Sequence, residues 1–159
     1  MPIQNLIGSL TEAYATDQGI VEGTEYEDEL GNVYRWVKRS ADTCAAKLAL
    51  TSLGAERLHG SATPTVKLPT GADQPFAGAR VTGATSLDGT NPWGWVQVAG
   101  AITLTDDGTV VADRFVSIAG TSGKVKVADA LGVTKYFFGV AQTAGNDGDA
   151  VVVNVPKQY

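Results

Sequence analysis

The chain has 159 residues, of which 43% are apolar and 18% are charged, and its formal net charge is −5. It is too apolar for a disordered protein, and 19 glycines without a fixed period exclude collagen. One domain is expected, since domains most often have roughly 100–150 residues. The negative charge argues against a protein that grips nucleic-acid phosphates. One cysteine and one histidine leave no internal disulfide and no histidine pair for zinc.

No apolar run approaches the roughly 20 residues that span a bilayer, so we expect no membrane partner. The first residues lack the basic segment and apolar stretch of a secretory signal, which predicts synthesis in the cytoplasm.

Acidic residues are concentrated near the N-terminus. Residues 1–34 contain seven carboxylates and no lysine or arginine. A cluster of like charges at a chain end is usually a solvated surface. The alternative is an arm that docks on a basic surface of a neighbouring subunit. We predict an extended N-terminal arm over residues 1–22, followed by a single β domain over residues 23–159.

Residues 24–38 have the pattern of two short strands around a turn at 29–32, whose glycine and asparagine suit the positive φ of hairpin turns. On the second strand, Tyr34 and Trp36 share one face and two valines share the other. Both faces therefore carry large apolar groups. Such a strand is either covered on both sides within the fold or leaves one side for a partner.

Residues 41–58 have the strongest helical propensity in the chain, because alanine, leucine, lysine and glutamate dominate them and proline is absent. We predict at most one short helix there. From residue 60 to 78, three prolines and three glycines predict a long irregular connection with one short edge strand at 65–68. The irregular excursion from the β domain thus covers about residues 41–78.

From residue 79 onward the pattern is that of strands. Residues 93–104 alternate so that valine, isoleucine and leucine face the predicted core, while Trp93 and Trp95 face the other way. Further strands are expected at 110–119, 124–128, 136–142 and 150–155. Short strands about ten residues apart favour a mainly β fold, an antiparallel β-sandwich or small barrel.

Few residues are candidates for catalysis or metal binding. His59 lies in the irregular connection without a nucleophile signature, and Cys44 beside two alanines is most simply a buried apolar side chain. Residues 120–124 lack the full spacing of a phosphate-binding loop. The oxygen ligands at 146–149 fit no EF-hand and suit a tight turn. We predict no catalytic, cofactor-binding or metal-binding residue.

The aromatic residues Tyr34, Trp36, Trp93 and Trp95 are the candidate interface residues. Tryptophan favours interfaces because a large apolar ring carries one N–H donor. Three interpretations are open for the face with Trp93 and Trp95. It is packed within the monomer, it is a surface for self-association or docking on a larger assembly, or it is a platform for a sugar.

Three segments together resemble small head proteins of tailed bacteriophages. Residues 23–38, Gly-Thr-Glu-Tyr-Glu-Asp-Glu-Leu-Gly-Asn-Val-Tyr-Arg-Trp-Val-Lys, are similar to the opening of these proteins. Residues 94–100 and 138–142 are similar to phrases that recur in the same group. These small proteins look like capsid decoration, or cement, proteins.

The resemblance implies a structural virion protein, not an enzyme, that binds the outer capsid surface and stabilises the head across capsomer seams. Its implied partners are the major capsid protein and further copies of itself in a homotrimer, after synthesis in the host cytoplasm. A clamp of this kind resists the pressure of packaged DNA by burying surface across the seam in many copies. No cofactor, nucleic acid or membrane is implied.

In this view the arm is the segment that grips the shell. It carries Ile3, Leu6, Ile7 and Leu10 and would lie along a capsid subunit, adding a strand to an exposed edge. The alternative from another class is a virion-surface module that recognises a glycan or receptor through Trp93 and Trp95.

Overall fold

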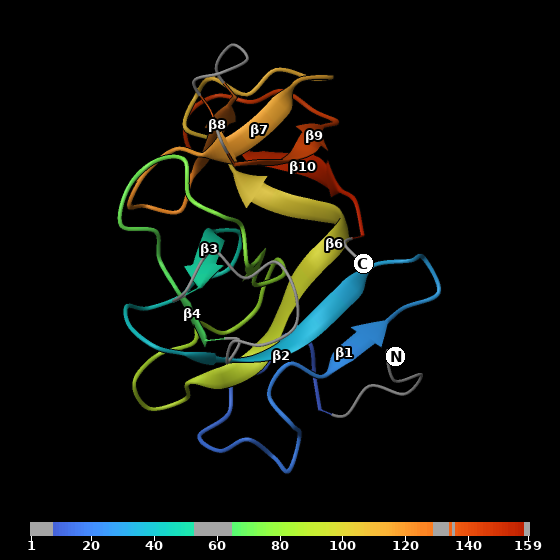
Figure 1. Ribbon diagram of the computed structural model, residues 1–159, viewed down its shortest axis with the longest axis vertical. Coiled ribbons are helices and arrows are strands. Elements are labelled where there is room, and N and C mark those ends of the chain that lie inside the picture. Colours follow the sequence, from blue (N-terminus) through green and yellow to red (C-terminus); the bar gives the residue numbers. More distant parts are fainter. Residues whose placement is uncertain (1–7, 53–64, 129–133, 135, 158–159) are drawn as a thin grey trace.

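The computed structural model describes residues 8–52, 65–128, 134 and 136–157, and these residues form an all-β fold (Figure 1). These ranges contain no helix, and so none that could cross a membrane. The mainly β prediction is confirmed. The strands are β1 (Glu25–Glu27), β2 (Val33–Arg39), β3 (Ala49–Ser52), β4 (Thr65–Lys67), β5 (Gly78–Ala79), β6 (Trp93–Thr105), β7 (Phe115–Ile118), β8 (Val125–Val127), β9 (Phe137–Ala141) and β10 (Ala150–Val155).

Five of the strands close into a small barrel. β2 pairs with the first half of β6, and the ring continues through β5, β3 and β4, each pair antiparallel. A parallel pairing of β4 with β2 completes it. β1 pairs antiparallel with β2, as the hairpin prediction for residues 24–38 requires.

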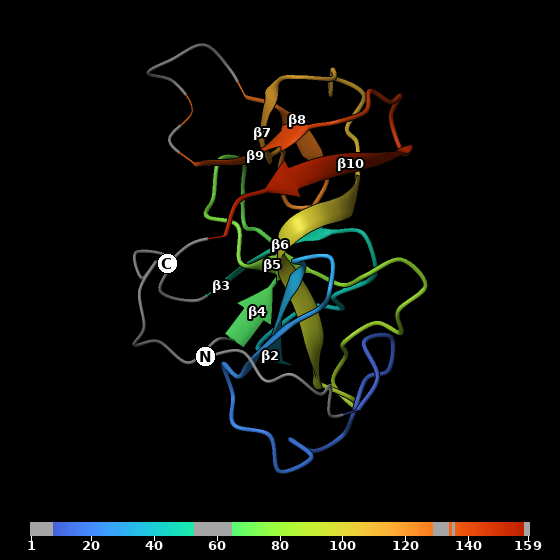
Figure 2. The same ribbon diagram turned by 90° about the vertical axis from the view of Figure 1, so that its right-hand side faces the viewer.

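β6 belongs to two sheets. Its residues 93–99 pair with β2, and its residues 100–105 pair with β10. The change falls at Gly100, whose φ of 97° lies in the left-handed region that favours glycine. A Cβ there would lie 3.0 Å from the Cα of Asn32 and would overlap its side-chain oxygen. The second sheet continues from β6 in the order β10, β9, β7, β8 and lies at one end of the barrel (Figure 2).

The apolar core has three clusters. Apolar side chains fill the barrel, and others pack against the outside of its wall. Val37, Leu50, Val66 and Val96, from four barrel strands, form one cluster. A second joins the inner face of the second sheet to the barrel wall, and its members include Ile102, Leu104, Val116, Ile118, Val151 and Val153 with Ala49 and Ala79. The third lies on the other side of β2 and β6 and is aromatic.

The helix predicted within residues 41–58 is wrong for the described part, residues 41–52. Residues 49–52 are β3, which pairs with both β4 and β5. Cys44 forms an isolated bridge with Leu87. Barrel pairing overrides the intrinsic preference of alanine and leucine for helix. The rest of the predicted helix lies outside the described residues.

The strand predicted at 110–119 is shorter than expected, since β7 begins at Phe115. The backbone N–H of Val110 donates to Asp106 Oδ1 at 3.1 Å, and Asp113 has a φ of 63°, so the preceding residues form a turn. The other strands predicted from residue 93 onward agree with the structure to within one residue at each end.

Candidate functional site

Three of the four candidate interface residues lie in the interior. Trp36 and Trp95 are 0% exposed and Tyr34 is 6% exposed. The two indole rings meet edge to face with centroids 5.3 Å apart, and Trp93 stacks on Trp36 at 6.3 Å. The Lys38 ammonium lies 5.5 Å from the centre of the partly buried Trp93 ring. Of the three interpretations, packing within the monomer is therefore the one that the structure shows, and Tyr34, Trp36 and Trp95 are core residues and not interface residues.

Residues 8–22 lie on this aromatic cluster. Leu10 and Tyr14 pack against it, and Ile20 is a buried member of it. Tyr14 and Trp93 exchange two backbone hydrogen bonds, of 2.8 and 3.0 Å. Leu10, predicted to contact the capsid, therefore contacts the core of its own chain. The other predicted capsid-contacting residues lie outside the described residues; they are Ile3, Leu6 and Ile7.

A buried arginine holds this N-terminal segment on the barrel. Arg80 is 0% exposed, and its guanidinium donates hydrogen bonds of 2.6–3.3 Å to the carbonyl oxygens of residues 10–12, Thr85 and Trp95. Gly94 makes room for it, since a Cβ at that position would lie 2.9 Å from Nη1 of Arg80. Burial lowers the pKa of Arg80 to about 10, so the group stays charged at neutral pH. Arg80 is not among the candidate residues predicted from the sequence.

Asp28 organises the turn between β1 and β2. Its carboxylate accepts hydrogen bonds from the backbone N–H groups of Leu30 and Asn32, the Asn32 side chain and the Tyr34 hydroxyl. Burial acts to raise the pKa of Asp28, but these hydrogen bonds together outweigh it and the pKa is lowered. Burial and the neighbouring Asp28 charge raise the pKa of Tyr34 to about 12. The predicted interface residue Tyr34 is therefore part of a structural turn.

Other acidic residues of the N-terminal region are also paired within the chain. Glu25 forms an ion pair with Arg35 at 2.7 Å, and Glu27 forms one with Lys157. Burial raises the pKa of Glu22. Part of the acidic surface predicted from the sequence is thus neutralised locally.

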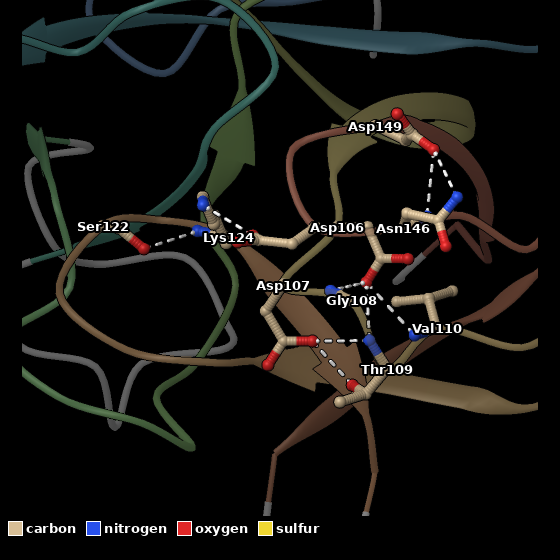
Figure 3. Close-up of polar contacts among 10 residues, drawn as sticks. Asp106, Asp107, Gly108, Thr109, Val110, Ser122, Lys124, Asn146 and Asp149 are labelled. Atoms are coloured by element: carbon tan, nitrogen blue, oxygen red, sulfur yellow. Dashed lines mark hydrogen bonds and ion pairs between the residues drawn. The ribbon is translucent and has the colours of Figure 1, made fainter.

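A second group of carboxylates lies where the loop after β6 meets the loop before β10 (Figure 3). Asp106 is 0% exposed, and its Oδ1 accepts hydrogen bonds of 2.8–3.1 Å from the backbone N–H groups of residues 108–110. Asp107 accepts from both the N–H and the hydroxyl of Thr109. These carboxylates close a tight turn after β6, as the Asp-Asp-Gly sequence predicts.

The facing loop at 146–149, considered above for calcium, is organised in the same way. Asp149 accepts a hydrogen bond of 3.0 Å from the N–H of Asn146, and Asp147 forms an ion pair of 2.8 Å with Lys124. Within the described ranges, no three acidic, histidine or cysteine side chains are placed to hold a metal ion. The loop at 146–149 is thus a structural turn, and the ion pair of Asp147 joins it to Lys124.

Of the residues considered for nucleophilic or phosphate chemistry, Cys44 and residues 120–124 lie in the described part of the chain. Cys44 is 0% exposed, and burial raises the pKa of its thiol to about 11, so it packs as a small apolar side chain. Residues 120–124 form a turn that leads into β8. His59 lies outside the described residues.

The large exposed aromatic side chains lie on the second sheet. Phe115 is 55% exposed and Phe137 is 46% exposed, and their ring centroids are 5.0 Å apart. β7 and β9 pair side by side, which brings the two rings onto the same face. Strand alternation at 136–142 separates Phe137 from Phe138, which is 8% exposed. The sequence analysis included neither phenylalanine among the candidates.

The chain shares its fold with part of a phage head fiber. The solved structure is that of the head fiber gp8.5 N base in bacteriophage phi29, with a TM-score of 0.53 and 11% identity. The match covers 79% of this chain and 94% of that chain. At this identity the similarity establishes a common fold. No family model and no curated protein matches the sequence.

Proposed function

We propose that this chain is a structural virion protein of a tailed bacteriophage, a decoration protein that binds the outside of the head and stabilises the shell. The observation that carries the proposal is the fold shared with the head fiber base, which extends over 94% of that chain. The resemblance of residues 23–38, 94–100 and 138–142 to small phage head proteins supports the same class. The proposed partners are the major capsid protein and further copies of this chain in a homotrimer.

The fold suits a mechanical role. The closed barrel removes open sheet edges, and β6 carries one continuous backbone from the barrel into the second sheet. A clamp stabilises a shell in proportion to the surface that it buries, and repetition over many copies multiplies the effect. We propose a non-enzymatic role without a cofactor.

The proposed contact with the capsid protein is made by Ile3, Leu6 and Ile7. Leu10 no longer belongs to this set because it packs on the aromatic cluster. Arg80 binds the backbone of residues 10–12, which fixes the point where the N-terminal residues meet the body. Burial of an aliphatic side chain contributes about 1.5–3 kcal/mol, so three of them are enough for attachment in many copies.

The alternative function, glycan binding through Trp93 and Trp95, is not supported by the positions of these side chains. It requires two neighbouring exposed rings, but Trp95 is enclosed in the core and Lys38 lies over Trp93. We therefore retain attachment to the shell as the proposed function.

The test is to mix the purified chain with expanded empty heads of the phage that encodes it. The chain should sediment with the heads and raise the temperature at which they rupture. A variant with serine in place of Ile3, Leu6 and Ile7 should lose binding. A matched control is Val21→Ser, which changes a 77% exposed apolar side chain elsewhere. If the unaltered chain does not sediment with the heads, the proposed function is wrong.

The serine variant is a sharper test than removal of residues 1–22. That deletion would also take Tyr14 and Ile20 from the aromatic cluster and so destabilise the fold. The serine variant should unfold at the same temperature as the parent chain, and this measurement separates lost attachment from lost structure. Full binding by that variant would assign attachment to another part of the surface.

A further inference from the structure

The outer face of the second sheet carries exposed or partly exposed side chains on four strands, although Ser117 on β7 is 0% exposed. The inward side chains of β6, β10 and β7, such as Ile102, Val153 and Val116, are buried in the core. Their neighbours in the alternation point away from it. Ala101 on β6 and Asn154 on β10 are exposed, and both lie on this outer face.

The pairing register joins these outward residues into one surface. Ala101 is opposite Asn154, Asn154 is opposite Val140, and Val140 is opposite Phe115. A second row holds Thr103 opposite Val152 on β6 and β10, and on β7 and β9 it holds the buried Ser117 opposite Phe137. The first row therefore crosses four of the five strands of the sheet, from β6 to β7.

This face differs from the rest of the molecule in charge. The accessible outward positions named above on β6, β10, β9 and β7 are alanine, threonine, asparagine, valine and phenylalanine, so among these positions there is no charged side chain. Lys126, opposite Ser117, stands at the edge on β8. A neutral sheet face with two half-exposed phenylalanines has the composition of an interface core, from which charged residues are depleted.

We propose that this face is the surface through which one copy of the chain binds another. The net charge of the chain is the reason for choosing a second copy as the partner. Each copy carries a net charge of −5, so two copies repel each other wherever acidic surfaces meet. A neutral face lets two copies approach without juxtaposed like charges, and it has no basic patch that would select an acidic partner. The inference rests on the self-association in the proposed function and names the surface that carries it.

The size of the face predicts a weak association in free solution. Four strands about 4.8 Å apart, with six residues on β6 and on β10, five on β9 and four on β7 at about 3.3 Å each, give a flat area of about 330 Å² per copy. Two copies together remove about 700 Å² from water, which is the size of a weak, transient contact. The association should therefore depend on protein concentration in the micromolar range.

The experiment measures the mass of the full chain by sedimentation equilibrium up to about 200 µM. The parent chain should exceed the monomer mass, and Phe115→Glu and Phe137→Glu should both be monomeric. Leu30→Glu is the matched control, since it places the same charge at an 88% exposed apolar position in the turn between β1 and β2. It should associate as the parent does.

A second substitution tests the charge argument with almost no change of shape. Asn154→Asp should weaken association at least about fivefold at low salt, with recovery as salt screens the repulsion. Asn154→Gln, which adds no charge, should associate within about twofold of the parent. Each variant should keep the fold, because the substituted side chains are exposed, and thermal unfolding of each variant checks this.

Two results would overturn the inference. One is a parent chain that stays monomeric over the whole concentration range. The other is an associated chain whose mass is unchanged by Phe115→Glu, Phe137→Glu and Asn154→Asp. Both are distinct from failure of the proposed function, which is read from sedimentation with empty heads. Loss of shell binding by the Ile3, Leu6 and Ile7 variant with unchanged mass would leave the pairing face in place.

Discussion

Replacement of Arg80 by methionine should detach the N-terminal segment from the barrel and destabilise the chain. Methionine fills a similar volume but donates no hydrogen bond. In the parent chain the guanidinium makes six hydrogen bonds to backbone carbonyl oxygens, three of them to residues 10–12. The substitution removes the arginine donor from five carbonyl oxygens, of which the oxygen of Thr11 keeps its hydrogen bond from the backbone N–H of Thr85.

The magnitude depends on which of the carbonyl oxygens water can reach afterwards. The bond to the carbonyl oxygen of Trp95, at 2.6 Å, is fully buried, whereas the other five are partly buried. A buried carbonyl without a partner costs about 1–3 kcal/mol, and a hydrogen bond to a charged group makes a net contribution of about 1.5–3 kcal/mol, less where water reaches the oxygen. Relief from burying a cation offsets part of the loss. We expect a net destabilisation of about 3 kcal/mol, or about 6–12 °C in Tm for a domain of this size.

The assay combines global and local measurements. Urea unfolding followed by tryptophan fluorescence reports the aromatic cluster, because Trp36, Trp93 and Trp95 meet there. Hydrogen exchange reports the segment itself, since the amide of Tyr14 is bonded to the carbonyl of Trp93. In the Arg80→Met variant, exchange over residues 10–14 should accelerate more than exchange in β10.

Arg35→Met is the control. It removes an arginine whose ion pair with Glu25 is more than a third exposed, and such pairs contribute about 0–1 kcal/mol. Suppose that Arg80→Met is no less stable than Arg35→Met and that the amides of residues 10–14 keep their protection from hydrogen exchange. The hydrogen bonds from Arg80 to the carbonyl oxygens then do not hold the N-terminal segment.

Three further predictions concern local structure. Gly100→Ala should destabilise the chain by about 2–4 kcal/mol in urea unfolding, since strain at positive φ adds to overlap with Asn32, whereas Gly120→Ala, with open space around it, should be neutral. Equal stability of these two variants would contradict this. The Cys44 thiol should react with a disulfide reagent at pH 8 at the rate of unfolding, and fast labelling of the folded chain would show that it is accessible. Folding lowers the pKa of Asp28, so the ionised carboxylate stabilises the fold above the ordinary pKa of 3.8 and this stabilisation is lost as pH falls through the folded pKa. Asp28→Asn should therefore make the decrease of Tm with acid less steep. An unchanged profile of Tm against pH would refute this prediction.

Local patterns were enough to predict four of the five strands from residue 93 onward to within one residue at each end, β7 being the exception. β10 coincides with the predicted 150–155 because its side chains alternate between core and surface and turn residues flank it. The hairpin at 24–38 followed from Gly31 and Asn32 in the turn. In each case the determining signal lies within about ten residues of the element.

Features that depend on distant partners could not be predicted in this way. β3 arises in a segment of helical composition because it is paired on both sides by strands that follow later in the chain. Arg80 had no sequence signal, since its partners are carbonyl groups and not side chains, and three belong to residues about 70 positions earlier. A backbone oxygen is present at every position, so the sequence does not show which of these oxygens accept hydrogen bonds from Arg80.

The choice among the three interpretations of the aromatic face could not be made from the sequence for the same physical reason. Alternation shows that Trp95 and Val96 lie on opposite sides of β6, but it does not show which side another element covers. Both sides are covered, because residues 8–22 are held over Trp95 by backbone pairing and by Arg80, neither of which has a hydrophobic period. Phe137 has the same alternation signal and is 46% exposed, since none of the described residues covers it as residues 8–22 cover Trp95. Which sheet face the N-terminal segment occupies therefore decides where a surface for association is left, and this places the proposed interface on the outer face of the second sheet instead of on β2 and the first half of β6.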